Sequence, residues 1–525
     1  MHDVVIVGAG TAGSVLAERL SRSGRQRVLL IEAGGAPASR FVRIPAGFAK
    51  LFKGPLDWNL ESEPQQAAGG RRIFTPRGKM LGGSSNMNAQ VHQWCHPADF
   101  DGWAGLGADG WSWADVAPVF RAQERWLGGD DDAARGRDGP MVVSPNRNAR
   151  ALSHAFVAAA RAAGLPSAPG YNGGAYRGAW LCELAHLDGR RFSAYNAYLE
   201  PALRRPNLQV VTDAHATRLL FHNRRAAGVV VRRGGREEQH AAHRVVLAAG
   251  AFGSPQLLML SGVGPASALA ALGIAVRHDA PEVGANLQDH PLSLLIARTR
   301  SRDTLKKAES LPSLLRYLLF KRGMLASNGV EAFAFTSICD HRAPDLELIF
   351  VPFEWRDEGL TPPQLHAFGI APAVVAPRSR GTLQLRSADP LAPPRIDFGL
   401  LSDPDGIDAA VLLGGVRLAR RIAATAPLAG LCAGEVFPGP ALESDDALRP
   451  RLHEVLQTVY HPSSTCRMGT DPGAVVDPRL RVRGVGGLWV ADASVMPTVP
   501  RGHPNAVVAM IANRAAEWIA ADDAV

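Results

Sequence analysis

The sequence predicts an α/β protein, α+β overall, whose first part is a Rossmann-like domain. Three observations lead to this prediction. Residues 2–34 read as a buried strand, a glycine-rich turn, a helix and a second buried strand. Residues 244–264 again read as strand, small-residue turn and helix. The length of 525 residues exceeds one ordinary core and suits a large doubly wound body with a second layer, or two domains.

The N-terminal unit, HDVVIVGAGTAGSVLAERLSRSGRQRVLLIEAGG, has the pattern of a dinucleotide cradle. Gly8 permits the tight turn, Gly10 lets the backbone approach a pyrophosphate, and Gly13 lets the helix lie close to the sheet. The helix N-terminus then faces the phosphate charge. Glu32 ends the second strand, where a carboxylate can accept a hydrogen bond from a ribose 2′-hydroxyl. An acidic residue there disfavours NADP and leaves both FAD and NAD open.

The segment RVVLAAGAFGSPQLLMLSGVG, Arg244–Gly264, predicts a strand that returns to the same sheet. Its apolar run is typical of a buried strand, and small residues follow as a turn. A helix is expected to start near Ser254. The pattern extends the α/β body without indicating a function.

The composition excludes several classes of protein. With 46% hydrophobic and 20% charged residues, the chain is typical of a globular protein. The formal charge of +8 comes from scattered basic residues, so nucleic-acid binding is not expected. The five cysteines are far apart and form no Cys-x-x-Cys pair, which argues against a disulfide framework and a zinc site. No signal segment or long apolar run is evident, so a cytoplasmic location is expected.

The stretch HPSSTCRMG, His461–Gly469, gathers residues that could serve as nucleophile, metal ligand or proton acceptor. Ser463 and Ser464 lack the G-x-S-x-G flanks of a serine nucleophile. His461 and Cys466 supply two metal ligands at most, so no metal site is predicted. A proton-handling histidine is the hypothesis that survives, although the chain has sixteen histidines and the residues alone do not single out His461.

Several motifs spread along the chain together resemble those of the glucose-methanol-choline (GMC) oxidoreductases, including the bacterial choline dehydrogenase-like and alcohol dehydrogenase-like flavoproteins. They are GKMLGGSSNMN (Gly78–Asn88), GAFGSPQLLMLSGVG (Gly250–Gly264), HPSSTCRMG, VDPRLRV (Val476–Val482) and VADASVMPTVPRGHPN (Val490–Asn505). The match extends over almost the whole chain, apart from the middle, roughly at 295–375.

The resemblance implies FAD as the cofactor. Some relatives bond the flavin covalently to a histidine at the position of Met87, which cannot form that bond, so non-covalent FAD is expected. The residues that fall at cofactor-binding positions are Gly8, Gly10, Thr11, Ala12, Gly13, Glu32, Ala33, Gly83, Ser84, Asn88, Val91, Ala216, Asp492, Ala493, Pro504 and Asn505.

The resemblance also implies two catalytic histidines, His461 and His503. The expected reaction is oxidation of an alcohol CH–OH group, with histidine as general base and hydride passing from the carbinol carbon to flavin N5. The product is an aldehyde or a ketone, and the electron acceptor is oxygen or a quinone. Two alternatives stay open: a flavin-containing lyase of the hydroxynitrile lyase type, and a non-catalytic flavoprotein.

Three residues depart from the family pattern. Ser464 replaces the glycine of H-P-x-G-T, and a serine there is strained if the backbone needs a positive φ. His92 and Cys95 stand where an aromatic and a small residue are usual, close to the expected flavin loop. A pocket wall different from that of other members is therefore expected.

The resemblance implies domains that are not divided cleanly along the sequence. Residues 1–290 are expected to form the N-terminal FAD-binding part, and 291–450 the substrate-binding or cap region. The C-terminal homology region is expected at 376–516, and its end, 450–525, returns to the FAD domain with the catalytic histidines.

The substrate domain is expected to contain an antiparallel sheet. The strand-like runs DLELIFVPF (Asp345–Phe353) and GTLQLRS (Gly381–Ser387) agree with that. Glu331 could recognise a cationic substrate such as choline or serve as a buried polar anchor, so choline is not assigned.

The segment LPSLLRYLLFKRG, Leu311–Gly323, has five leucines on one helical face. Either a core or lid helix or a helix on a membrane surface explains them. Membrane association is not favoured, but a peripheral position at the inner membrane stays open beside the cytoplasmic one.

Overall fold

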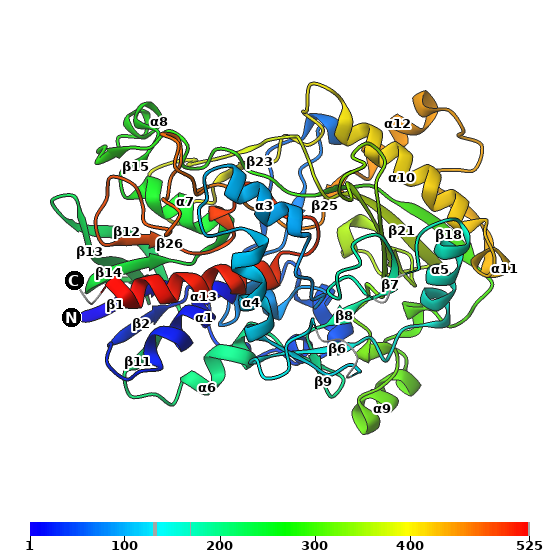
Figure 1. The fold of residues 1–525 in the computed structure, drawn as a ribbon, viewed down its shortest axis with the longest axis horizontal. Coiled ribbons are helices and arrows are strands. Elements are labelled where there is room, and N and C mark those ends of the chain that lie inside the picture. Colours follow the sequence, from blue (N-terminus) through cyan, green and yellow to red (C-terminus); the bar gives the residue numbers. More distant parts are fainter. Residues whose placement is uncertain (130–133, 168–169, 523–525) are drawn as a thin grey trace.

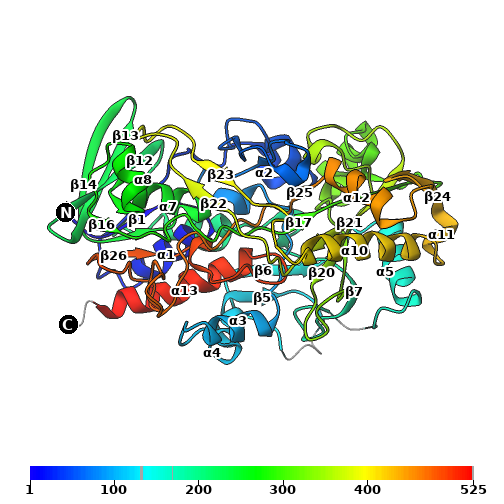
Figure 2. The same cartoon turned by 90° about the horizontal axis from the view of Figure 1, so that it is seen from above.

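The computed structural model describes residues 1–129, 134–167 and 170–522. It contains two large sheets that lie side by side along the longest axis of the molecule (Figure 1). The first strand, β1 (His2–Val7), and the last helix, α13 (Asn505–Ala521), both lie at the first sheet (Figure 2). Among the described residues, no helix is both long enough and apolar enough to cross a bilayer.

The first sheet has seven strands in the order β11-β2-β1-β14-β13-β12, with β26 paired to β14. Its strands are β1 (His2–Val7), β2 (Val28–Ile31), β11 (Leu208–Val211), β12 (Ala214–His222), β13 (Arg225–Arg233), β14 (Arg236–Leu247) and β26 (Leu488–Val490). The β11, β2, β1, β14 and β26 pairings are parallel, and β12 to β14 form an antiparallel meander. The continuous apolar runs of β1 and β2 are buried, as strands covered on both faces require.

Two helices from opposite ends of the chain pack together beside this sheet (Figure 1). They are α1 (Thr11–Ser21) and α13 (Asn505–Ala521). At the turn into α1, Gly8 has a φ of +99°. A Cβ on Gly13 would lie 1.8 Å from the carbonyl oxygen of Gly8, so this position requires glycine for the helix to lie so close to the turn.

The predicted second strand and helix are present as the parallel strand β14 and α7 (Gly250–Leu260). The helix starts four residues before the expected Ser254. The carboxylate of Asp492 accepts hydrogen bonds from the Gly250 amide at 2.9 Å and from the Ser254 hydroxyl at 2.6 Å. This partner for the first turn comes from far along the chain, so a local pattern does not reveal it.

The second sheet has eight strands, ordered β24-β18-β21-β20-β19-β7, with β17 paired to β21 and β25. Its strands are β7 (Gly178–Leu181), β17 (Pro291–Leu292), β18 (Leu295–Thr299), β19 (Ala332–Thr336), β20 (Leu346–Val351), β21 (Ala367–Val374), β24 (Cys432–Phe437) and β25 (Gln457–Thr458). All of its pairings are antiparallel. Strand β7 joins it from a part of the chain that precedes residue 290.

Side chains alternate between the two faces of β20. Phe350 points toward the helices and stacks on Phe156 of α5 (Ala151–Ala162), with ring centroids 4.7 Å apart. Beside α5 lies α10 (Ile407–Ala423), which covers β20 and β21. Ile349 and Val351 face the other way and line a cavity. One face of this sheet thus packs against the helices, and the other forms part of the cavity wall.

The run GTLQLRS does not belong to the second sheet, which corrects that part of the prediction. It forms β22 (Thr382–Gln384), which pairs with β23 (Arg395–Asp397) in a two-stranded ribbon. The amide of Leu383 donates to the carbonyl of Gly284 at 2.6 Å, and the amide of Leu287 donates to Gly381 at 3.0 Å. These bonds tie the ribbon to the loop at 284–287.

Candidate active site

A cavity of about 770 Å³ lies between the two sheets. Its wall includes both predicted histidines and every predicted cofactor residue except Gly13, which packs behind the turn. The predicted residues in the wall are Gly8, Gly10, Thr11, Ala12, Glu32, Ala33, Gly83, Ser84, Asn88, Val91, Ala216, His461, Asp492, Ala493, His503, Pro504 and Asn505. Segments separated by almost the entire chain therefore meet at one site.

The glycine turn before α1 leaves room for a ligand. A Cβ on Gly10 would meet no atom within 4 Å, whereas one on Gly83 would lie 2.7 Å from the Cα of Gly10. The two glycine loops thus touch each other, and the remaining space at Gly10 opens to the cavity at a helix N-terminus. Backbone amides in this arrangement suit a pyrophosphate.

The Glu32 carboxylate links the turn before α1 to the segment that follows β2, at this end of the cavity. It accepts hydrogen bonds from the amides of Ala9 and Gly34, both at 2.9 Å. Burial raises its pKa to about 7, against the lowering effect of those amides. An ionised carboxylate has further acceptor capacity, so the side chain can also receive a ribose hydroxyl.

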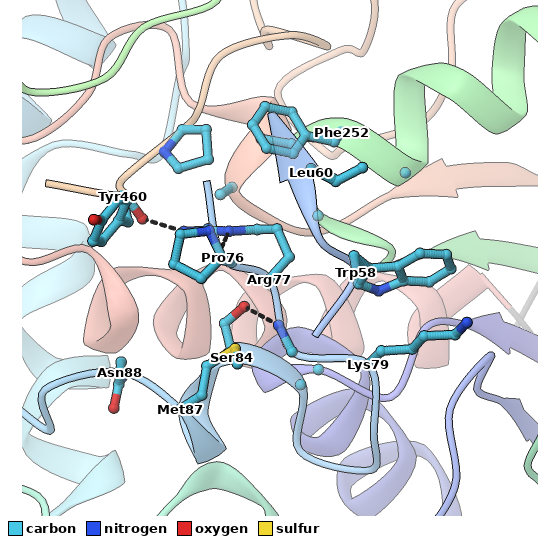
Figure 3. A pocket seen from close by; sticks show the side chains of 18 of the residues that line it. Trp58, Leu60, Pro76, Arg77, Lys79, Ser84, Met87, Asn88, Phe252 and Tyr460 are labelled. Carbon is cyan, nitrogen blue, oxygen red and sulfur yellow. Dashed lines mark hydrogen bonds between the residues drawn. The ribbon is translucent and has the colours of Figure 1, made fainter. Parts of the chain in front are cut away.

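The loop that carries Met87 forms another part of the wall (Figure 3). The Ser84 hydroxyl accepts from the amide of Gly78 at 3.1 Å, and the Arg77 guanidinium donates to the Tyr460 carbonyl at 2.6 Å. Arg77 thereby connects this loop to the residue before His461. Met87 lines the cavity with a thioether, which offers no nucleophilic nitrogen to a flavin.

The start of α13 completes the cradle. Asn505 begins the helix, and its side-chain amide donates to the hydroxyl of Thr11 at 2.9 Å. Asn505 and Thr11 both line the cavity, so the N-termini of α13 and α1 meet there.

His461 and His503 face each other in the same cavity. Their ring centroids are 4.8 Å apart, and the ring planes make an angle of 75°. The amide of His461 donates to the carboxylate of Asp289 at 2.9 Å, and the amide of His503 donates to the side chain of Gln93 at 3.0 Å. Both backbones are therefore fixed by buried side chains from elsewhere in the chain.

Two further side chains contact the histidine rings, and the sequence did not single them out. Nδ1 of His290 lies 3.0 Å from Nδ1 of His461. The Glu347 carboxylate of β20 lies 3.0 Å from Nε2 of His503. Both side chains are fully buried. A charged residue in a buried, strand-like run was the signal available for Glu347, because such a residue needs a partner.

The histidine cluster sits in an environment that disfavours positive charge. Burial holds the pKa of His461 well below its ordinary value of 6.5, and the nearby rings of His503 and His290 add to this effect. Burial also lowers the pKa of His290 to about 3 and raises that of Asp289 to about 7. His461 is therefore a neutral imidazole at neutral pH, which is the form that accepts a proton.

The backbone around His461 is strained. Tyr460 has a φ of +64° and Ser464 a φ of +76°. The serine thus occupies the conformation that glycine would adopt without penalty, at a cost of about 1–2 kcal/mol. His461 nevertheless lines the cavity. Such strain is typical of functional loops that the surrounding structure holds in place.

His92 and Cys95 are not part of the cavity wall, contrary to the prediction. His92 lies behind it, with Nε2 3.5 Å from the Glu124 carboxylate, and burial lowers its pKa to about 3. The Cys95 thiol lies 4.0 Å from the carbonyl oxygen of His503. These residues support the wall and the His503 loop.

Glu331 is a buried polar anchor. Its carboxylate accepts hydrogen bonds from the Arg150 amide and the Ser153 hydroxyl, both at 2.6 Å, and from the Ser327 hydroxyl at 2.5 Å. It does not line the cavity. No cluster of three or more His, Cys, Asp or Glu side chains suited to a metal ion occurs within the described ranges.

The fold and the site define a dinucleotide-binding enzyme with a histidine pair. The GMC oxidoreductase family models match residues 2–292 and 377–512. The chain belongs to the GMC oxidoreductase family.

Relatives match along their whole length. An uncharacterized GMC-type oxidoreductase of Mycobacterium tuberculosis is 44% identical, covering 98% of this chain and 99% of the relative. An alcohol dehydrogenase [acceptor] of Pseudomonas putida is 38% identical over 99% and 96% of the two chains. An oxygen-dependent choline dehydrogenase of Sinorhizobium fredii is 41% identical over 98% and 95%.

Solved structures have the same fold. Pyridoxine 4-oxidase from Mesorbium loti superimposes with a TM-score of 0.89 at 31% identity, covering 98% of each chain. Formate oxidase from Aspergillus oryzae gives a TM-score of 0.91 at 27% identity, covering 99% of this chain and 98% of that one. That formate oxidase structure concerns the effect of a mutation on the modification of FAD.

Proposed function

We propose that this GMC oxidoreductase oxidises the CH–OH group of a small alcohol to an aldehyde or ketone with non-covalently bound FAD. The observation that carries the proposal is that His461 and His503 share one cavity with the dinucleotide cradle around Gly10. Relatives named alcohol dehydrogenase and choline dehydrogenase support an alcohol as substrate.

FAD fits the residues that are present. The space at Gly10, the helix N-termini and the Glu32 carboxylate suit a pyrophosphate and a ribose. When bound, FAD would supply the hydride acceptor. The chain's own residues bind the alcohol, orient it and remove its hydroxyl proton.

His461 is the proposed base. Two neutral imidazoles whose Nδ1 atoms are 3.0 Å apart share one hydrogen, so one ring donates and the other accepts. If His461 donates to His290, its Nε2 keeps a lone pair for the alcohol proton. His290 is then a positioning residue that sets the tautomer of His461.

His503 is the proposed second contact to the alcohol oxygen. Nε2–H of its ring donates to the Glu347 carboxylate, and a second ring hydrogen, on Nδ1, would donate to the alcohol oxygen. The carboxylate orients the ring and compensates the positive charge of that form. Glu347 is thus also a positioning residue.

Anaerobic mixing of the purified holoprotein with choline and with aliphatic, aromatic and sugar alcohols tests the function. We expect at least one alcohol to bleach the oxidised flavin spectrum with formation of a carbonyl product. A cyanohydrin is mixed with the protein in the same way, and its cleavage to a carbonyl compound and hydrogen cyanide, with the flavin still oxidised, would favour the lyase. Repeating the assay with oxygen and with a quinone analogue identifies the electron acceptor.

The pH dependence should reveal the environment of the base. A general base works in its deprotonated form, so activity falls as the pH drops through its pKa. Because the pKa of His461 is held well below 6.5, flavin reduction should be constant above about pH 7 and decline only in more acidic buffer.

The variant His290→Asn checks the assigned contact. It removes a ring that lowers the pKa of His461, so the midpoint of the pH profile should move upward toward 6.5 while FAD stays bound. The amide oxygen of asparagine can still accept the Nδ1 hydrogen of His461. A midpoint that stays in place would rule out coupling between the two rings.

A further inference from the structure

Helix α9 (Leu311–Phe320) presents its apolar face to solvent. Of its ten residues, Ser313 and Tyr317 are the buried ones. The large apolar side chains expose between 39% (Leu314) and 71% (Leu319) of their surface. They are Leu311, Leu314, Leu315, Leu318, Leu319 and Phe320. The leucines therefore do not pack into a core, and an exposed group of this size is typical of an interaction surface.

The inner side of the helix carries the buried Tyr317. Just after the helix, the amide of Gly323 donates to the side chain of Asn148 at 3.0 Å, which attaches this segment to the body of the protein. In Figure 1 the helix lies at the periphery of the molecule, beyond the second sheet. The apolar face thus points away from the body of the protein.

Basic residues are frequent in α9 and in the segments that flank it along the chain. The segment 302–322 contains six basic residues and two acidic ones, Asp303 and Glu309. The basic residues are Arg302, Lys306, Lys307, Arg316, Lys321 and Arg322. Asp303 pairs with Arg150 at 3.3 Å and Glu309 pairs with Lys50 at 2.6 Å, so cations from outside the segment already balance both acids.

A second cavity, of about 530 Å³, lies next to the end of α9. Arg147, Arg150, Arg316, Lys321 and Arg322 line it, together with Phe320 and one acid, Asp188. Apolar and cationic groups therefore meet at one place, as they do where lipid tails and phosphate head groups are bound together.

We propose that α9 and the basic residues around it form a docking surface for an anionic phospholipid bilayer, which we call the α9 surface. Such a bilayer supplies both chemistries that the surface presents: an acyl region for the leucines and Phe320, and phosphates for the lysines and arginines. A second copy of the chain would bring the same positive charge against this one across a two-fold axis, which disfavours a symmetric dimer.

Helix α9 is connected to the catalytic cavity along the chain. The chain leaves α9, passes through the short helix η6 (Met324–Ala326) and reaches Val330, which lines that cavity. The proposal does not depend on the identity of the alcohol.

Co-sedimentation of the full-length holoprotein with vesicles tests the α9 surface. We expect binding to phosphatidylcholine vesicles that contain about 30% phosphatidylglycerol, and at least ten-fold weaker binding to pure phosphatidylcholine. Binding should decline at about 0.5 M salt, where the electrostatic attraction is screened.

Variants separate the apolar contribution to vesicle binding from the electrostatic one. Leu318→Glu with Leu319→Glu should reduce vesicle binding at least ten-fold, and so should Arg316→Glu with Arg322→Glu. The matched control is Leu106→Glu, an exposed leucine far from α9, which should bind as the wild type does. All variants should keep their FAD and their dye-coupled activity.

Two results would overturn the proposal. One is equal binding of the wild type and both double variants to anionic vesicles. The other is a wild-type protein that does not bind vesicles but forms a dimer by light scattering, which the leucine double variant abolishes. That outcome would assign the apolar face to a second copy of the chain.

Discussion

Replacing His461 by alanine is expected to slow the anaerobic reduction of the flavin by an alcohol on the order of 100-fold or more. The variant should keep its FAD, because the cradle around Gly10 and Glu32 does not use this side chain. The loss follows from removing the neutral imidazole that accepts the hydroxyl proton before hydride leaves. Stopped-flow absorbance of the flavin measures the rate.

Substitution of His503 should slow flavin reduction less than substitution of His461, and the loss should depend on the residue introduced. His503→Asn should retain more activity than His503→Ala, because an amide can still hydrogen-bond to the alcohol oxygen. If both histidines act on the same oxygen, the double alanine variant should be little slower than His461→Ala. Fully multiplicative losses would argue that the two rings act on different groups.

A matched control is His453→Ala, eight residues before His461 in the sequence. His453 does not line the cavity, so its loss should leave flavin reduction unchanged. Reduction of the His461→Ala flavin at the wild-type rate would make His461 a structural residue and remove the basis of the proposed mechanism.

The local patterns in the sequence predicted the nucleotide-binding half of the fold well. The strand, turn and helix around Gly8 to Gly13 depend on neighbouring residues, and such contacts are encoded locally. The start of α7 was misplaced because its first-turn partner, Asp492, lies more than two hundred residues away. The ribbon of GTLQLRS was assigned to the wrong sheet because strand propensity does not specify a partner.

The histidine pair could be predicted only through the family resemblance. The two buried side chains that contact its rings, His290 and Glu347, could not be predicted at all. His290 reaches His461 across 171 positions, and Glu347 reaches His503 across 156. The first contact depends on the pairing of β17 with β25 inside the second sheet, and the second on how β20 lies against the loop that carries His503. No local pattern records either arrangement. The same limit applies to α9, whose periodicity revealed an apolar face but not its outward orientation.

Replacing Gly10 by valine is expected to abolish FAD binding in a chain that still folds. Gly10 has a φ of −68°, which valine tolerates, and a Cβ there meets no protein atom within 4 Å. The added side chain would occupy the space at the helix N-terminus that suits the pyrophosphate. The purified variant should therefore be colourless, with a circular dichroism spectrum close to that of the wild-type protein.

Two further glycines give this experiment its controls. Gly105→Val, at the end of another helix and also without a close contact, should fold and stay yellow, whereas Gly13→Val should fail to fold because its Cβ would lie 1.8 Å from the Gly8 carbonyl oxygen. FAD is measured after acid precipitation, and wild-type flavin should appear in the supernatant because Met87 cannot hold it covalently. Flavin that stays in the pellet would contradict non-covalent binding, and a Gly10→Val protein with one FAD per chain would place the pyrophosphate elsewhere.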